Sequence, residues 1–260
     1  MMNASMEITA LVLTYNEEEN ILRTLRSIAW VDQILVVDSG SSDQTLDIVA
    51  GFSNARVVQN PFISFADQCN FGLRQIETEW VLSIDADYCF PATAEAEIRT
   101  AIETPIAGFA AQFEYAIEGK VVRGSILPAR TVLYRRQKAC YQNDGHGHRV
   151  GIDGHVEDLQ LKITHDDRKP LARWLASQNS YAAIEAEKIS TSSFSQLSPQ
   201  DRVRKCILFA PMMVFVLTYV IRGGFMSGWH GFFYASQRFC AELLLSLCLI
   251  DRMLEPKSTR

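Results

Sequence analysis

Two carboxylates, Asp85 and Asp87, stand one residue apart at the end of the apolar run "VLSIDADYCF" (residues 81–90). Burying an ionised carboxylate is costly unless solvent, a cation or a basic side chain neutralises it. In proteins, Mg²⁺ is typically held by one or two carboxylates together with substrate phosphates, and Mn²⁺ accepts the same oxygen ligands. The D-x-D spacing therefore predicts a divalent-metal site that neutralises a phosphorylated substrate.

The residues before this pair alternate between strand and helix patterns. Continuous apolar runs of strand length alternate with segments whose apolar residues recur at helical spacing. Such alternation indicates a parallel sheet with helices on both faces. The predicted strands are 7–16, 33–38, 55–59 and 80–84, and the predicted helices are 18–28, 43–48 (with Ser42 or Asp43 as cap) and 65–76.

Polar residues follow three of these strands, at the edge where open parallel sheets bind ligands. Each alone is equally consistent with ordinary turn chemistry, but together they suggest one site. Neither G-x-G-x-x-G after the first strand nor a G-x-x-x-x-G-K-[ST] loop is present, so a metal would have to take over the phosphate-binding role. The residues concerned are Thr14, Asn16 and Glu17 after the first strand, Asp38 after the second, and Asp85 and Asp87 after the fourth.

Composition and charge limit the class of protein. The 260 residues are 48% hydrophobic and 21% charged, which fits a large globular domain with an appendage. Six cysteines without a C-x-x-C pair predict reduced thiols in a cytosolic setting, and the N-terminus lacks an export signal pattern. Residues 1–167 carry a net charge of −11 and residues 168–260 one of +6, so the basic part is expected to face an anionic membrane rather than nucleic acid.

The stretches "LVLTYNEEENILRTLRSI", "ILVVDSGSSDQTLDIV" and "WVLSIDADYCF" resemble the family 2 glycosyltransferases of the GT-A fold. The resemblance extends over residues 7 to about 190 and is closest to bacterial lipopolysaccharide-core β-glucosyltransferases. It implies an α/β fold, namely a Rossmann-like, mostly parallel sheet with helices on both faces. It further implies an inverting enzyme that takes a sugar, such as glucose from UDP-glucose, with Mg²⁺ or Mn²⁺ as cofactor.

By position, the resemblance assigns roles to individual residues. The metal would act as a Lewis acid and as an anchor for the UDP leaving group. Two departures stand out: Cys69 replaces an arginine that is frequent before Asn70, and Tyr88 replaces a frequent glutamate after the D-x-D. The implied nucleoside pocket comprises Thr14, Tyr15, Asn16 and Glu17, with Asp38 at the uracil or ribose, Asp85 at the ribose or metal, and Asp87 at the metal.

An inverting transfer needs a general base for the acceptor hydroxyl. The stretch "YQNDGHGHRVGIDGHVED" holds the candidates, and a solvated polar loop is the alternative interpretation of each of them. By its position after "VLYRR", Asp144 fits best and Glu157 second. The other candidates in this stretch are His146, His148, Asp153, His155 and Asp158.

Three residues that come later in the sequence are weaker candidates for the same site. His165 either completes the metal shell or simply ends the strand-like segment "LQLKITH". Arg168 and Lys169 either neutralise the diphosphate or cap an exposed turn.

The C-terminal part suggests a membrane appendage. We expect a catalytic domain over 1–168, a connecting helix and linker over 169–195, and an apolar helical segment over 196–260. "CILFAPMMVFVLTYVI" is short for a membrane span and contains Pro211, and the following apolar stretch carries charges. Helices lying in the interface are therefore favoured over a buried hairpin or two true spans.

The sequence thus predicts a glycosyltransferase on the cytoplasmic face of the inner membrane, in peripheral or monotopic association with the membrane surface. Its expected partners are a nucleotide-sugar donor and a lipid-linked or cell-envelope glycan acceptor such as lipopolysaccharide core, with no nucleic acid. Two alternatives remain open. A nucleotidyltransferase would usually have a glycine-rich basic loop where this chain has "LTYNEEEN", and a non-catalytic scaffold would not need the D-x-D.

Overall fold

The computed structural model describes residues 7–145, 147–207 and 209–254, which form two compact units. The first unit comprises residues 1–121 and 127–168, and the second comprises residues 122–126 and 169–260. Each is described separately below.

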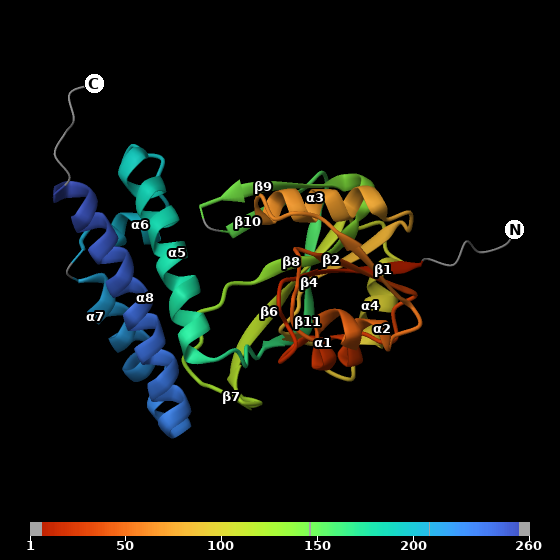
Figure 1. Cartoon of the computed structure of the whole chain (residues 1–260), viewed down its shortest axis with the longest axis horizontal. Coiled ribbons are helices and arrows are strands. Elements are labelled where there is room, and N and C mark those ends of the chain that lie inside the picture. The colour runs from red at the N-terminus through yellow and green to blue at the C-terminus, as the bar shows by residue number, and fades with distance from the viewer. Residues whose placement is uncertain (1–6, 146, 208, 255–260) are drawn as a thin grey trace, which may run out of the picture. The chain divides into compact units, whose positions relative to one another are not determined.

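The first unit is built on a nine-stranded sheet (Figure 1). Its order is β3-β2-β1-β4-β8-β6-β11-β5, with β7 paired to β6. The pairs β3–β2, β2–β1, β1–β4 and β6–β11 are parallel, whereas the other pairs are antiparallel. The strands are β1 (Ile8–Thr14), β2 (Gln33–Asp38), β3 (Ala55–Gln59), β4 (Trp80–Asp85), β5 (Tyr88–Cys89), β6 (Gly108–Ile117), β7 (Lys120–Val121), β8 (Arg130–Arg135) and β11 (Val156–His165).

Helices cover both faces of this sheet, as the sequence predicted (Figure 1). On one face α1 (Ile21–Ser27), α2 (Thr45–Ala50) and α4 (Ala94–Ile102) contribute buried apolar residues to the larger core. On the other face lies α3 (Phe65–Gln75), joined by the separate hairpin β9 (Ala139–Asp144) and β10 (Gly147–Ile152). The 3₁₀ turn Arg136–Lys138 connects β8 to this hairpin.

Apolar patterning accounts for the central strands. In β1 and β2 nearly every residue is buried, as expected for parallel strands covered on both faces. The amphipathic helix α3 begins at Ser64, whose hydroxyl accepts a hydrogen bond from the amide of Asp67. Gly72 of α3 lets this helix approach β1 closely, because a Cβ atom there would lie 2.4 Å from Leu11 Cδ1.

The second unit is helical. It consists of α5 (Leu171–Thr191), α6 (Pro199–Arg204), α7 (Ala210–Phe215), a π-helical segment (Val216–Ile221), a 3₁₀ turn (Gly224–Ser227) and α8 (Gly228–Leu254). The helix pairs α5–α8 and α7–α8 lie side by side (Figure 1). A small core of α5 and α8 residues includes Ala186, Ile189 and Leu249.

One helical stretch among the described residues, Gly224–Leu254, is long and apolar enough to cross a membrane by length and composition. The preceding apolar helix, Ala210–Ile221, is shorter. The alternative of two true spans would need a second helix of that length.

Candidate active site

The D-x-D lies at the carboxyl end of β4. The intervening Ala86, in the turn after β4, is buried in the core, whereas Asp85 and Asp87 on either side of it are only partly buried. The hydroxyl of Thr24 in α1 donates a 2.6 Å hydrogen bond to the carbonyl of Ala86 and fixes this turn. The side chains of Asp85 and Asp87 are 39% and 12% exposed, so both carboxylates are placed at the rim of the sheet.

Asp87 is paired with His165 at the end of β11. Nε2 of His165 lies 3.1 Å from Oδ2 of Asp87, and the amide of Asp166 donates to the carbonyl of Asp87. The imidazole ring packs between Tyr88 and Tyr115, with centroid distances of 5.3 and 5.1 Å. Burial would lower the pKa of His165, but the charge and hydrogen bond of Asp87 outweigh it and raise that pKa above 6.5.

Asp85 faces a basic residue that the sequence analysis did not single out. Nη1 of Arg130, at the start of β8, lies 3.8 Å from Oδ2 of Asp85 and donates a 2.9 Å hydrogen bond to the hydroxyl of Tyr88. Its position follows from the antiparallel pairing of β8 with β4, which the sequence does not reveal.

Asp38 organises the neighbouring strand ends. This carboxylate is fully buried and accepts hydrogen bonds from the hydroxyls of Thr14 and Ser41 and from the amides of Gly40 and Ser41. A direct contact between Asp38 and a nucleoside would require the side chain to leave these partners. In this arrangement Asp38 fixes the shape of the loop after β2.

The loop after β1 is tied to the same structure. Asn16 adopts a left-handed conformation with φ of 55°, in which its amide donates to Ser41 Oγ and its side-chain oxygen accepts from the amide of Ser42. The amide of Glu17 donates to Thr45 Oγ1 at 2.7 Å, and Tyr15 is exposed. The structure therefore brings the five predicted nucleoside-pocket residues to adjoining loops, with Thr14 and Asp38 buried beneath.

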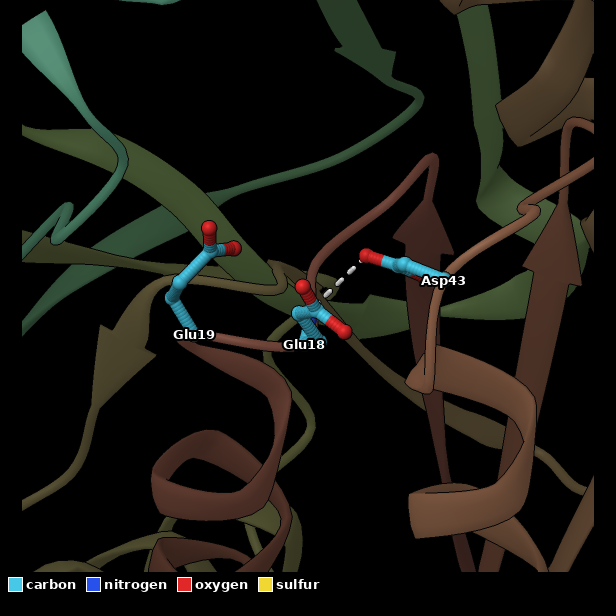
Figure 2. Close-up of side chains that lie close together, drawn as sticks. All are labelled: Glu18, Glu19 and Asp43. Carbon is cyan, nitrogen blue, oxygen red and sulfur yellow. Dashed lines mark hydrogen bonds between the residues drawn. The ribbon is translucent and has the colours of Figure 1, made fainter.

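Three further acids, Glu18, Glu19 and Asp43, gather on these loops (Figure 2). Their nearest oxygens all lie within 4.8 Å of one another. The amide of Glu18 donates to Asp43 Oδ2, and the amide of Gln44 donates to Glu18 Oε2. These bonds make the cluster a connection between the loops after β1 and β2.

The polar stretch 141–158, which the alternative interpretation treats as a solvated loop, is instead mostly strand. Asp144 ends β9, where its carboxylate pairs with Arg149 of β10 at 2.9 Å. His148 lies on the opposite face of the hairpin, packed against Tyr141 and Phe65. Burial lowers the pKa of His148, and the nearby charge of Asp85 opposes that shift. The candidate His146 lies outside the described residues.

The structure does not bring Glu157 to the D-x-D. Glu157 lies at the amino end of β11, beside Phe109, and its side chain contacts His155. His165 ends the same strand, so about 26 Å of extended chain separates the two residues. Asp153, His155 and Asp158 lie at that distant end as well.

An ion-pair cluster stabilises the segment that follows His165. The buried carboxylate of Asp166 receives Nη1 of Arg23 at 2.8 Å and Nη2 of Arg168 at 2.9 Å. The amide of Arg168 also donates to Asn20. The guanidinium of Arg168 is thus paired with Asp166 of the protein itself. Lys169 is the first residue of the main stretch of the second unit. The contribution of Arg23 had no sequence signal, because it stands on a helix like any other surface arginine.

The donor set at the rim suits a divalent cation. Two carboxylates and one imidazole come from β4, the turn after it and β11, and hard cations such as Mg²⁺ and Mn²⁺ prefer carboxylate oxygen. Asp85, Asp87 and His165 would hold the ion, and the half-buried Asp85 lies beside Arg130. The chemical types of these donors suit the metal that the D-x-D predicts, and within the set Asp87 and His165 are in direct contact.

The fold of the first unit is the GT-A fold. The model of the family described as Glycosyl transferase family 2 matches residues 9–154, which is more than half of the chain. The chain therefore belongs to glycosyl transferase family 2.

Two solved structures share the fold. The crystal structure of Staphylococcus aureus TarS 1-349 in complex with UDP-GlcNAc aligns with 98% of this chain and 93% of that chain, at 15% identity and a TM-score of 0.51. The mannosyltransferase PcManGT from Pyrobaculum calidifontis, in complex with GDP-Man and Mn²⁺, aligns with 96% and 86% of the respective chains, at 16% identity and a TM-score of 0.51.

Among curated relatives, the lipopolysaccharide core biosynthesis glycosyltransferase LpsC of Rhizobium meliloti is 24% identical over 238 residues, covering 88% of this chain and 86% of that protein. An uncharacterized glycosyltransferase of Rickettsia bellii is 37% identical over 82 residues, which is 31% of this chain and 28% of the length of that protein.

Proposed function

We propose that this protein is a metal-dependent, inverting glycosyltransferase that moves a sugar, such as glucose, from a UDP-sugar to a lipid-linked or cell-envelope glycan such as lipopolysaccharide core. The observation that carries the proposal is the pairing of Asp87 with His165, next to Asp85 at the carboxyl end of β4, in a family 2 chain. Fold alone does not determine substrate, so the argument rests on this site.

The loops after β1 and β2 provide the nucleoside side of the donor site. Tyr15, Asn16 and Glu17 offer exposed or half-buried groups, and Asp38 with Thr14 holds the loops in shape. The complexes of TarS with UDP-GlcNAc and of PcManGT with GDP-Man and Mn²⁺ support a nucleotide-sugar donor with a divalent ion. We propose in addition that the base of the donor is uracil and that its sugar is glucose.

A bound divalent ion would neutralise the diphosphate and act as a Lewis acid for the departing nucleotide. Asp85 and Asp87 would supply the negative charge that holds it, and His165, which contacts Asp87, would be the third ligand. The tyrosines on either side of His165 restrict solvent around this pair.

We assign the general base to Asp144. The β9–β10 hairpin runs beside β4, because Tyr141 bonds to Ser83, and Asp144 follows three residues later at the end of β9. In attacking the sugar, the acceptor hydroxyl would pass its proton to the carboxylate of Asp144, which would then give up Arg149. Glu157 lies at the wrong end of β11 for this role.

The acceptor assignment rests on two observations. The similarity to LpsC extends over most of both chains, and the second unit exposes many large apolar side chains on α7, the following turns and α8. An amphiphilic acceptor in a membrane would be reached by an enzyme whose appendage lies in the membrane surface. We therefore place the protein at the inner membrane, on its cytoplasmic face.

The test is donor hydrolysis. The full chain is incubated with Mn²⁺ or Mg²⁺ and a panel of UDP- and GDP-sugars, and the released nucleoside diphosphate is measured with and without chelator. We expect metal-dependent release from one UDP-sugar, increased by lipid-linked glycan acceptors. Tight metal-dependent UDP binding without release from any donor, even with such acceptors, would favour a non-catalytic scaffold.

A further inference from the structure

We propose that Arg130 occupies the metal site's acidic rim in the metal-free protein and turns to the donor diphosphate when metal and nucleotide arrive together. This inference rests on the proposed function. It makes Arg130 a donor-binding residue that couples the binding of metal and nucleotide.

The position of Arg130 follows from the sheet. Strand β8 runs antiparallel to β4, pairing Leu133 with Leu82, so its first residue lies beside the carboxyl end of β4. There the guanidinium donates to the hydroxyl of Tyr88 at 2.9 Å and stands 3.8 Å from the carboxylate of Asp85. Arg130 and Asp85 form an ion pair, but their separation exceeds hydrogen-bond length. The positive charge therefore lies near the Asp85 carboxylate without a hydrogen bond that fixes its position.

The guanidinium is anchored on one side and open on the other. Its central carbon lies 6.0 Å from the ring centroid of Phe113, which packs against Tyr88 at 4.9 Å. Tyr88 itself is buried, whereas 49% of the Arg130 side chain is exposed. Arg130 therefore combines a fixed attachment with a solvent-facing edge that still has donors to offer, since a guanidinium carries five N–H groups.

A guanidinium and a divalent ion compete for the same carboxylate. A metal bound to Asp85 and Asp87 would lie a few ångströms from the Arg130 charge, and like charges at that distance repel each other. Arg130 thus opposes the binding of a bare metal ion. A diphosphate turns this unfavourable effect of Arg130 into a favourable one, because its oxygens can accept hydrogen bonds from Arg130 while they also coordinate the metal.

The consequence is a site that favours the metal–nucleotide complex over either component alone. By thermodynamic linkage, each ligand raises the affinity of the other by the same factor. Part of this factor comes from the positive charge of Arg130.

The variant Arg130→Gln tests the proposal through binding rather than turnover. Free Mn²⁺ is titrated by its electron paramagnetic resonance signal in the full chain, with and without UDP. We expect the affinity for Mn²⁺ alone to rise roughly 3- to 10-fold, because a competing charge is removed. We expect the affinity for UDP at saturating Mn²⁺ to fall about 10-fold or more, because charge-assisted hydrogen bonds are lost.

Two further variants serve as comparisons. Arg130→Lys keeps the charge, so its affinity for Mn²⁺ alone should stay within about 2-fold of wild type. Arg99→Gln is a matched control, because Arg99 also pairs with an aspartate, Asp32, and lies over an aromatic ring, Trp30. Asp32 precedes β2, at the opposite end of the strands from the D-x-D, so both affinities should remain unchanged.

The outcomes separate this inference from the proposed function. If wild type binds Mn²⁺ and UDP but Arg130→Gln binds Mn²⁺ alone no more tightly, Arg130 is not a competing cation and the inference is overturned. If wild type binds neither ligand, the proposed function fails and this inference with it.

Discussion

Asn70 holds Tyr141 by two hydrogen bonds, donating from its side-chain amide to the Tyr141 carbonyl at 2.9 Å and accepting from the Tyr141 amide at 3.0 Å. The side chain thereby acts as a strand partner and attaches the β9–β10 hairpin to α3. The Tyr141 hydroxyl adds bonds to Ser83 and Tyr134, both at 2.8 Å. The hairpin that carries Asp144 is thus fixed to the strand that carries Asp85.

Asn70→Ala should loosen this hairpin. Losing two partly buried hydrogen bonds is expected to lower the free energy of unfolding by about 1–3 kcal/mol, measured by urea denaturation. Amide exchange within residues 139–152 should accelerate while that of β1 stays slow. Equal acceleration in both segments would contradict a local role for Asn70.

In Gly72→Ala, helix propensity and packing have opposite effects on the stability of the protein. In an exposed helix the change would stabilise by about 1 kcal/mol. Here the new Cβ would lie 2.4 Å from Leu11 Cδ1 and 3.2 Å from Val37 Cγ2, so we expect net destabilisation of about 1–3 kcal/mol. A thermal midpoint at or above that of wild type would show that α3 can shift away from β1.

The parts of the fold that sequence predicted are those with strong local patterns. Strands β1 and β2 are buried on both faces and α3 is amphipathic with a serine cap, so their signals are contained within a few residues. The β9–β10 hairpin was missed because its inward face mixes the aliphatic residues Val150 and Ile152 with Tyr141, and because its attachment depends on a non-local partner, Asn70.

The same distinction between local patterns and non-local contacts applies to the residues of the candidate site. Asp85 and Asp87 follow an apolar run, and Thr14 and Asp38 follow buried strands, so their placement at one rim could be inferred. Glu157 and His165 lie close in sequence, yet strand β11 holds them at opposite ends. Arg130 could not have been selected, because the β4–β8 pairing joins residues about fifty positions apart.

Asp144→Asn tests the base. Removing the proton acceptor should lower kcat by about 10²- to 10⁴-fold, with little change in donor affinity. Turnover is measured with a saturating acceptor, and donor binding by calorimetry. Glu157→Gln is the matched control, expected to retain wild-type kcat because Glu157 lies at the far end of β11. Loss of turnover in the control alone would move the base to Glu157.

Membrane association should depend on the apolar turn before α8. Phe225 and Met226 of this turn are exposed, and Trp229, which follows in the first turn of α8, is 82% exposed. Replacing Trp229 and Phe225 together by serine should reduce co-sedimentation with vesicles containing anionic lipid about 10-fold or more, by the apolar area lost. Replacing exposed Ile63 of the first unit by serine is the control and should leave vesicle binding unchanged. Unaltered binding of the double variant would contradict insertion of this turn.

The most direct test of the central claim is metal-dependent UDP binding by Asp87→Ala, measured by calorimetry with Mn²⁺ and again with chelator. We predict that wild type binds UDP far more tightly with Mn²⁺, and that the variant loses this metal enhancement while circular dichroism shows an intact fold. Wild-type metal enhancement in Asp87→Ala would contradict the assignment of the D-x-D as the metal site.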